Sequence, residues 1–457
     1  MSTNDSIVIL GGGIIGLSIA YYISQSSPNR RIYIIDSAPQ LLESASGYAG
    51  GFLARDWFDP RAAALGSFSF KLHRELAESF DGQSRWGYAG SHVYSLSLDD
   101  APAGVRGEDW LLAGTSRAEA VGRRAYGHVN APGEQVNQDG TPAWIAPQEK
   151  ASWNVIANAE DCAQVEPRRL CEFLLDEGKK RGVEVLLGTK TTAVIKSRNG
   201  GISGVKLEST DGSKTSKTIQ CTDIIVASGC WAPRVIDTLF PKNRINLGID
   251  PLAGHSLLFK TPRYPTAFRN IEHGNSGKYH GKDKHTAYAI YCPPTESQPY
   301  SPEAYARLNI NSEPEIWIGG LNSSTMPLPE LATMTKDQID PESISELRNT
   351  AIRLCGLVGA DGEPTRDDLE ILKEGLCFRP ISKSGVPIIG RVPSRDLGGV
   401  EDSASGAKVW IAGGHGPWGI SMALGTGVVM SDLLSGREPR VDISALRVSS
   451  TTRTSKL

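Results

Sequence analysis

The 457-residue sequence lacks the features that mark several common classes of protein. Its formal net charge is only −3 and Lys and Arg form no stripe, so it carries no electrostatic footprint for nucleic acid. Its seven cysteines are scattered, and no two have the Cys-x-x-Cys spacing of a zinc or redox site. We therefore expect free thiols in a reducing compartment, no bound metal and no nucleic-acid partner.

Long uncharged runs are also scarce. Ile7–Ile23 is nearly free of charge, but it lacks the basic leader of a signal peptide and contains three consecutive glycines. A strand, a tight turn and a buried helix explain this run better than a membrane span does. No other segment approaches the length needed to cross a bilayer, so we expect a soluble protein with no membrane contact.

The most specific motif lies near the N-terminus. An apolar strand, Ile7–Leu10, is followed by the glycine-rich run Gly11–Gly16 (GGGIIG), an apolar helical run through Tyr22 and a second strand, Ile32–Ile35. A strand, a glycine turn, a helix and a strand in this order are typical of a unit that binds a dinucleotide.

The residue types of this unit suit that ligand. Gly11, Gly13 and Gly16 permit the tight turn and bring the backbone close to the pyrophosphate, whose charge is stabilised at the helix N-terminus. Asp36 ends the second strand about 20 residues after Gly16, where a carboxylate accepts hydrogen bonds from ribose hydroxyls and repels a 2′-phosphate. The unit alone does not distinguish NAD from FAD.

Later segments extend this unit across the chain. The sequence predicts a helix at Arg168–Arg181, and then four strands at Val183–Leu187, Thr191–Ile195, Ser203–Glu208 and Asp223–Gly229, the last of which ends in small residues. Near the C-terminus, Lys408–Ile420 predicts a strand that runs into a glycine-rich turn and a helix ending at Leu434. The nucleotide-binding domain is therefore expected to be discontinuous, built from residues 1–60, 160–245 and 370–440.

The intervening residues, 61–159 and 246–369, have a different character. They carry most of the aromatic residues, several Pro/Gly loops and alternating strands such as His285–Tyr291 and Glu315–Gly319. These patterns predict one substrate domain built on an antiparallel sheet. The expected fold class is α/β (α+β overall), with a Rossmann-like domain and a discontinuous second domain.

Single residues of this second domain are harder to interpret. Tyr288 and Tyr291 lie three apart on one predicted strand and point to opposite faces, so one can line a pocket while the other packs in the core. His273, His280 and His285 are close in sequence, but their spacing suits no standard metal site. We predict a solvated loop around these histidines.

The C-terminal residues 441–457 are expected to form a flexible tail. The chain ends Ser455-Lys456-Leu457, and a C-terminal Ser-Lys-Leu is read by the peroxisomal import receptor. Although any tripeptide can arise by chance, the preceding Ser/Thr/Arg residues leave this one exposed. We therefore expect the receptor as a partner and a peroxisomal location.

Four stretches together resemble the D-amino-acid-oxidase-like FAD oxidoreductases, which include glycine oxidase, sarcosine oxidase and fructosyl-amine oxidase. They are IVILGGGIIGLSIAYYIS, SASGYAGGFLA, TDIIVASGCWAPRV, and GLCFRPISKSGVPIIG with VWIAGGHGPWGISMALGTG. The Ser-Gly-Tyr-Ala-Gly-Gly and Gly-His-Gly-Pro-Trp-Gly signatures are similar to those of an uncharacterised fungal branch. The resemblance covers most of the first domain, covers the second only in outline, and implies that FAD is the cofactor.

The resemblance also implies which residues contact FAD. A loop of small residues, Ser46–Gly51, would follow the flavin and its phosphates; Thr191 or Thr192 would pass the adenine; and the turn after residue 413 would lie beneath the flavin. The cofactor-contacting residues are predicted to be Gly11, Gly13, Ile14, Ile15, Gly16, Asp36, Ser46, Gly47, Gly50, Gly51, Thr191, Ser228, Gly229, Cys377, Gly414, His415, Gly416 and Gly419. His415 either hydrogen-bonds the flavin or caps a turn.

Three residues carry the expectations about chemistry. Arg379 matches a family arginine that holds a substrate carboxylate, although a structural arginine is the alternative. Cys377 lies at or next to a cysteine that some relatives bond covalently to the flavin, and a buried thiol is the alternative. Trp418 stands where sarcosine oxidase has a lysine, which favours a bulkier or less charged substrate unless it only packs in the turn.

The resemblance implies an oxidase that removes a hydride from the carbon beside the amine nitrogen of an amino-acid-like or secondary-amine substrate. Molecular oxygen would then reoxidise the flavin and release hydrogen peroxide. Two alternatives stay open: a flavin dehydrogenase or biosynthetic tailoring enzyme that uses another acceptor, and a non-catalytic flavin-binding protein in trafficking. No nucleophile–base triad is expected, because the flavin supplies the difficult step.

Overall fold

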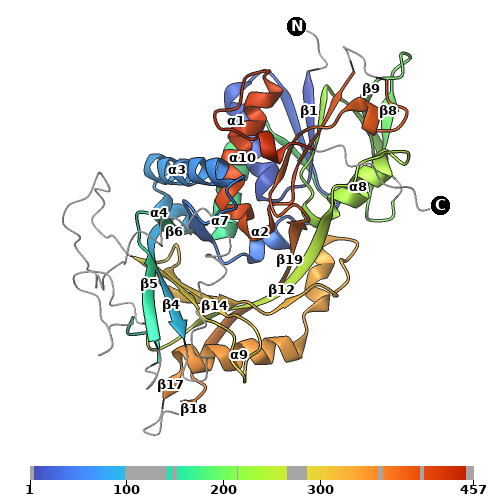
Figure 1. Cartoon of the computed structure of the whole chain (residues 1–457). Coiled ribbons are helices and arrows are strands. Elements are labelled where there is room, and N and C mark those ends of the chain that lie inside the picture. The colour runs from blue at the N-terminus through green and yellow to red at the C-terminus, as the bar shows by residue number, and fades with distance from the viewer. Residues whose placement is uncertain are drawn as a thin grey trace.

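The computed structural model describes residues 5–97, 142–146, 152–213, 215–264, 286–358, 364–401 and 406–448. A six-stranded sheet forms its upper part in Figure 1. In spatial order the strands are β20 (Ile388–Arg391), β21 (Lys408–Gly413), β11 (Asp223–Val226), β1 (Ser6–Leu10), β2 (Arg31–Ile35) and β7 (Glu184–Leu186). The edge strand β20 runs antiparallel to β21, and the other neighbours run parallel.

This sheet is buried on both faces, as parallel sheets usually are. Successive side chains of β1 alternate: Ile7 and Ile9 join one apolar cluster, and Val8 and Leu10 join another. Helices cover the first face, with α1 (Ile14–Ser26) packed between α10 (Gly419–Leu434) and α7 (Pro167–Lys180).

Further elements complete both faces. On the helical side, α3 (Ala63–Phe80) packs against α10, and α4 (Gly82–Trp86) packs against α7. On the opposite side lie α8 (Ala232–Leu239) and a small antiparallel sheet of β8 (Thr189–Lys196), β9 (Ile202–Ser209) and β10 (Ser216–Gln220). The predicted strands and helices of the nucleotide-binding unit are all present, within a few residues of their expected ends.

A second sheet of ten strands forms the lower part (Figure 1). Its strands are β3 (Phe52–Ala54), β4 (Ala89–Ser97), β5 (Ser152–Ala157), β6 (Cys162–Gln164), β12 (Ile249–Lys260), β13 (Ala287–Tyr291), β14 (Glu303–Leu308), β15 (Pro314–Gly319), β16 (Asn322–Ser323) and β19 (Glu370–Ser382). Among the described strands the pairing is antiparallel, except that β4 and β13 run parallel. The expected antiparallel sheet is therefore confirmed, with one parallel pair inside it.

The helix α9 (Pro341–Cys355) covers this second sheet. Its N-terminus has a favourable sequence, because Pro341 occupies the first turn and the Asp340 carboxylate accepts hydrogen bonds from the amides of Glu342 and Ser343. Leu347 and Leu354 on its inner face are fully buried in an apolar cluster with residues of β12, β13 and β15. Beyond α9, β17 (Leu357–Val358) pairs with β18 (Pro364–Arg366).

Two long strands connect the sheets. β12 and β19 pair along almost their whole lengths, and in Figure 1 they run from the lower sheet up to the base of the parallel sheet. At the upper end, Ile381 of β19 forms a bridge with His415, just after β21. β19 is therefore the element by which the second sheet reaches the glycine-rich turn near the C-terminus.

The structure corrects some of the expected boundaries. β3, β6 and β19 lie in ranges assigned to the nucleotide-binding domain, yet they pair in the ten-stranded sheet, because the chain crosses between the sheets inside these ranges. The expected tail from residue 441 begins with packed structure, since Ile443 and Leu446 are buried beside β20.

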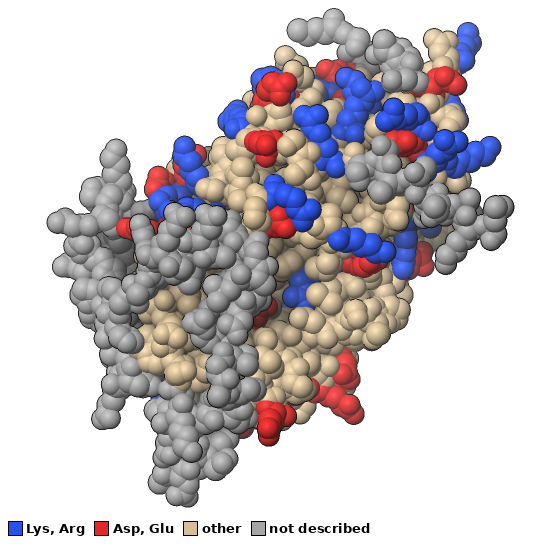
Figure 2. Space-filling model, in the orientation of Figure 1, with Lys and Arg blue, Asp and Glu red and all other residues tan. Residues whose placement is uncertain are grey.

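Some predicted features lie outside the described residues. They are His273, His280 and His285, the final Ser-Lys-Leu and most of residues 98–151. Among described residues, no His/Cys/Asp/Glu group could hold a metal ion, and no helix combines the length and apolar character needed to span a bilayer. On the face in Figure 2, basic and acidic side chains are interspersed over the upper part of the molecule.

A buried arginine ties strands β14 and β15 to the segments beside β3 and β6. Arg307 of β14 donates from Nε to Glu315 Oε1 of β15 at 2.9 Å, and both side chains are only 4% and 6% exposed. Its Nη1 donates to the backbone carbonyls of Gly50 at 2.9 Å and Val165 at 2.7 Å. Gly50 and Val165 flank the short pair β3–β6, so one guanidinium fixes the loop that enters the second sheet.

We predict that Arg307→Met lowers the free energy of unfolding by about 3–5 kcal/mol, because it leaves the Glu315 carboxylate and two carbonyls buried without their donor. Urea denaturation followed by far-UV circular dichroism measures the change. The matched control is Arg348→Met, which removes an ion pair with Asp367 whose side chains are both 39% exposed. The control should change stability by less than about 1 kcal/mol, and equal effects of the two variants would contradict the assignment.

Candidate active site

A cavity of about 690 Å³ lies between the two sheets. Its upper wall is formed where the parallel strands β1, β2, β11 and β21 end, which is where open α/β sheets bind their ligands. Its lower wall is formed by residues of β12 to β16 and β19. Residues from both sheets, separated by several hundred positions in the sequence, therefore share one binding space.

The glycine-rich turn between β1 and α1 forms one end of the cavity. Gly11 has a φ of +114°, and a Cβ there would lie 2.6 Å from the Ala227 carbonyl oxygen, so a larger residue is excluded. Gly16 does not line the cavity. A Cβ at Gly16 would lie 2.0 Å from the Gly11 oxygen, so this glycine lets α1 pack closely on the turn.

The N-terminus of α1 already faces an oxygen acceptor. Ser46 Oγ, from the short helix α2 (Ala45–Tyr48), accepts a hydrogen bond from the Ile14 amide at 3.0 Å. A Cβ on Gly13 would lie 3.2 Å from the same Ser46 oxygen, so a side chain at Gly13 would crowd this contact. The first turn of α1 thus presents backbone amides to a space lined by small residues, as an anionic group requires.

Asp36 closes the turn from the end of β2. Its Oδ2 accepts from the Gly12 amide at 2.8 Å, and its Oδ1 accepts from the Ala38 amide at 2.9 Å. Desolvation raises the pKa of Asp36, and these two backbone hydrogen bonds oppose the rise by favouring the ionised form. Because each oxygen has a second lone pair, the carboxylate keeps the capacity to accept further hydrogen bonds from a ligand.

Several buried polar atoms in the cavity wall have no hydrogen-bond partner among the described residues. They are Thr192 Oγ1, Ser228 Oγ and His415 Nδ1. Buried polar atoms are normally paired, so a bound group with hydroxyl, phosphate and heterocyclic nitrogen or oxygen atoms would supply the partners that the described part of the chain does not.

His415 lies where β21 turns toward α10. It is 3% exposed, and its Nε2 forms a hydrogen bond with Thr426 Oγ1 of α10 at 3.0 Å. Burial lowers the pKa of His415 to about 3, so the imidazole is neutral at physiological pH. Nε2 therefore anchors the turn to α10, while Nδ1 remains available to a ligand. The two roles predicted as alternatives, capping the turn and hydrogen-bonding the flavin, are compatible.

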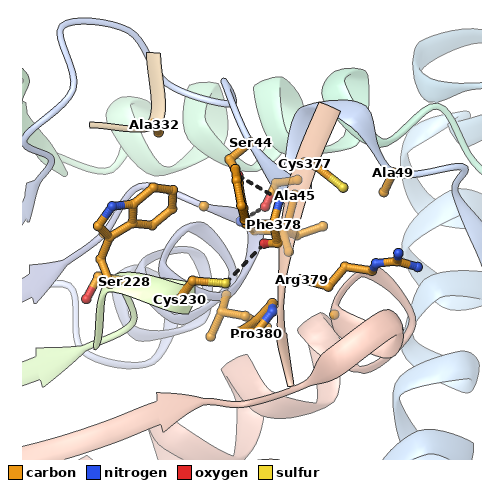
Figure 3. Close-up of a pocket in the computed structure, with 18 of the residues that line it drawn as sticks. Ser44, Ala45, Ala49, Ser228, Cys230, Ala332, Cys377, Phe378, Arg379 and Pro380 are labelled. Atoms are coloured by element: carbon orange, nitrogen blue, oxygen red, sulfur yellow. Dashed lines mark hydrogen bonds between the residues drawn. The ribbon is translucent and has the colours of Figure 1, made fainter. Parts of the chain in front are cut away.

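Strand β19 carries Cys377 and Arg379 along the cavity. Figure 3 shows both side chains extending from the strand on the side of Ala49, away from Cys230. The strand is held from both sides: the Phe378 amide donates to Ser44 Oγ at 3.4 Å, and its carbonyl accepts from Cys230 Sγ at 3.2 Å. These bonds fix the position of β19 relative to residues 44–51, the cofactor-facing loop.

The guanidinium of Arg379 has only one described partner, the side-chain oxygen of Asn322 on β16. Its Nε is buried, and no residue in the described ranges forms a hydrogen bond with it. On the neighbouring strand, Gly254 leaves the necessary room, because a Cβ there would lie 2.4 Å from Arg379 Nη2. A cation with an unpaired nitrogen in the cavity wall can bind a carboxylate.

Trp418 also lines the cavity, and it packs against the apolar core. Its ring meets Phe58 edge to face, with ring centroids 5.1 Å apart. Trp418 therefore packs in the fold and also lines the cavity, and its preference for a bulkier or less charged substrate stays a prediction.

Most of the predicted site residues line this one cavity. These are Gly11, Gly13, Ile14, Ile15, Asp36, Ser46, Gly50, Gly51, Thr191, Ser228, Gly229, Cys377, Arg379, His415, Gly416, Trp418 and Gly419. Gly16, Gly47 and Gly414 do not line it. A Cβ on Gly47 would lie 1.8 Å from the Leu42 oxygen, and Gly414 has a φ of +72°, so these glycines serve the path of the backbone.

The sequence did not identify several residues of the lower wall. Glu303, Tyr305, Trp317 and Asn322 all line the cavity, and so does Tyr291, whose face on its strand could not be assigned from sequence. The alternation of β13 and β14 offered a weak indication, but the pairing of these strands decides which side chains face the site.

Comparison with known proteins agrees with this geometry. The model of the DAO family, described as FAD dependent oxidoreductase, matches residues 6–433. The chain belongs to this family.

The relatives span nearly the whole chain. A Schizosaccharomyces pombe protein described as an oxidoreductase is 26% identical over 95% of both chains. Among solved structures, glycine oxidase from Geobacillus kaustophilus has a TM-score of 0.64 at 18% identity, covering 97% of this chain and 98% of its own. Iminodiacetate oxidase from Chelativorans has a TM-score of 0.62 at 16% identity, covering 97% and 100%. These two structures share the fold of this chain.

FAD is therefore the cofactor of this oxidoreductase, and the cavity fits it. The glycine turn and the amides of α1 suit the pyrophosphate, Asp36 suits the ribose, and Ser228, Thr192 and His415 offer the polar atoms that lack partners. When bound, FAD supplies hydride-accepting chemistry at carbon atoms beside an amine nitrogen, as in the family.

We expect the flavin to be released from the protein by acid. Burial raises the pKa of the Cys377 thiol, which disfavours the nucleophilic thiolate that would form a bond to the flavin. After precipitation with trichloroacetic acid, the yellow colour should appear in the supernatant. Colour that stays with the wild-type pellet but leaves a Cys377→Ala pellet would instead establish a covalent bond through this cysteine.

Proposed function

We propose that this protein is an FAD-dependent oxidase of an amino-acid-like or secondary-amine substrate, and that it releases hydrogen peroxide. The observation that carries the proposal is the position of Arg379. Its incompletely paired guanidinium lies in the same cavity as the glycine turn and His415. A carboxylate held there would place the rest of a small substrate inside the cofactor cavity.

The residues of the chain bind and orient rather than react. Arg379 and Asn322 hold the carboxylate end, and the packed ring of Trp418 limits how far the substrate can move along the wall. His415 is neutral and donates or accepts one hydrogen bond at Nδ1 without changing its charge. The names of the structural neighbours, glycine oxidase and iminodiacetate oxidase, support a small amino-acid-like substrate.

The decisive experiment is anaerobic reduction of the purified holoprotein. D-amino acids, N-methyl amino acids, cyclic imino acids and fructosyl amines are added in turn. The loss of flavin absorbance at about 450 nm is recorded after each addition. We expect bleaching by at least one class and one equivalent of hydrogen peroxide when air is admitted.

The other outcomes identify the alternatives. Bleaching without peroxide on admission of air, with turnover restored by an artificial electron acceptor, would establish a dehydrogenase or a tailoring enzyme. Absence of bleaching by every class would favour a flavin-binding protein without amine oxidase activity.

For a substrate found in this way, Arg379→Met should raise KM for carboxylates by roughly 10- to 150-fold, because about 1.5–3 kcal/mol of charge-assisted hydrogen bonding is lost. Flavin content should stay within experimental error of the wild type. Steady-state kinetics and the absorbance ratio of flavin to protein measure the two quantities. Arg395→Met, at a side chain that is 77% exposed, is the control. An unchanged KM in Arg379→Met would remove this residue from the substrate site.

A further inference from the structure

A second charged side chain lines the cavity in the lower wall. Glu303, the first residue of β14, lies there with Tyr305 of the same strand and Tyr291 of the neighbouring strand β13. Tyr305 Oη donates to Glu303 Oε2 at 2.5 Å, and the Tyr291 and Tyr305 hydroxyl oxygens are 3.1 Å apart. The only hydroxyl hydrogen of Tyr305 lies in its hydrogen bond to Glu303. Tyr291 is therefore the donor in the contact with Tyr305, and both hydrogen bonds are directed toward Glu303.

The two tyrosines remain donors under physiological conditions. Burial raises the pKa of both Tyr291 and Tyr305 well above the ordinary value, and the nearby charge of Glu303 raises it further. Neither hydroxyl therefore ionises, and both stay available as hydrogen-bond donors.

Within the described residues, no Lys, Arg or His forms an ion pair with Glu303. By contrast, Glu315 on the neighbouring strand β15 forms an ion pair with Arg307 of β14. In the same described residues, Oε1 of Glu303 also has no hydrogen-bond partner, whereas Oε2 accepts from Tyr305. An acidic side chain in a cavity wall without a cation of its own can bind a cation from outside.

Glu303 and Arg379 act on the same part of the cavity. The charge of Arg379 lowers the pKa of the Cys377 thiol and the charge of Glu303 raises it, although burial has the largest effect. Both charges therefore lie near this one residue of β19, yet the structure shows no ion pair between Glu303 and Arg379. Opposite charges that share a cavity without pairing match a ligand that carries both signs.

Aromatic rings continue the wall beside Glu303. The rings of Tyr305 and Trp317 stack with centroids 5.2 Å apart, and the rings of Phe52 and Tyr305 stack at 5.6 Å. This stack holds the ring of Tyr305, whose hydroxyl donates to Glu303.

We propose that Glu303 binds a cationic nitrogen of the substrate, an ammonium or substituted ammonium group, while Arg379 binds its carboxylate. The substrate class is then a zwitterion whose two charges are recognised by different sheet strands, β14 and β19. This inference rests on the proposed function, in that it assigns the site to the substrate of the oxidase. The carboxylate of Glu303 is a specificity-determining group, and Tyr305 is a positioning residue that orients it.

The test uses binding rather than turnover. The FAD-loaded protein is titrated with n-butylammonium chloride, with sodium butyrate and with 1-butanol at constant ionic strength, and the change in the flavin absorbance spectrum gives each Kd. In the wild type, butylammonium should bind at least about 10-fold more tightly than butanol, because a charge-assisted hydrogen bond is added. Equal binding of the two would overturn the proposal without any variant.

The variants separate the two charges. Glu303→Gln should weaken butylammonium binding about 10-fold or more and leave butyrate binding unchanged, and Arg379→Met should do the reverse. Flavin content and thermal midpoint show that each variant is folded. Glu303→Asp, which keeps the charge on a shorter side chain, should give an intermediate Kd and serves if Glu303→Gln does not fold. The same Kd for butylammonium in wild type and in both Glu303 variants would overturn the proposal.

This outcome is distinct from failure of the proposed function. If no amine bleaches the flavin but butylammonium binds through Glu303, the oxidase assignment fails and the cation site stands. If bleaching and peroxide are observed but Glu303→Gln binds butylammonium like the wild type, the oxidase stands and the cation site fails.

Discussion

The structure depends on the contact between the buried guanidinium of Arg307 and the glycine-containing loop that ends at Gly51. Arg307 joins Glu315 in the ten-stranded sheet to the carbonyls of Gly50 and Val165, at the point where the chain leaves the cofactor-facing loop. A buried ion pair by itself contributes little net stability, but the two additional carbonyls give this one a geometric role. It fixes where residues 50 and 165 meet β14, and Gly50 lines the FAD cavity beside this contact.

The parts of the fold that could be predicted are those with local causes. The strand, turn and helix from Ser6 to Ser26 follow from a short apolar run, three glycines and a helical run, all within a short window. The same is true of β21, its glycine turn and α10 near the C-terminus. In both places the ligand-facing residues are the turn residues themselves, so finding the motif also located the upper wall of the cavity.

The lower wall could not be predicted in this way, because strand pairing over long distances determines it. Whether Glu303 and Tyr291 face the cavity depends on the pairing of β13 with β14 and on the parallel pairing of β13 with β4. Long-range packing also constrains the glycines. A Cβ on Gly50 would lie 2.3 Å from the ring of Tyr305, so this glycine makes room for a side chain of the ten-stranded sheet and also lines the cavity. Gly16, Gly47 and Gly414 do not line the cavity, and their contact with FAD stays a prediction.

The strand order of the parallel sheet has a consequence for biosynthesis. β11 lies between β1 and β21, and β21 is made about 400 residues after β1. At roughly 5–20 residues per second, a ribosome takes roughly 20–80 s to cover that distance. In the part of this interval after β11 is made, the edge of β11 that pairs with β21 has no partner, and the turn that holds His415 does not yet exist. The nascent chain therefore cannot complete the wall of the FAD cavity before β21 and the turn after it have been made.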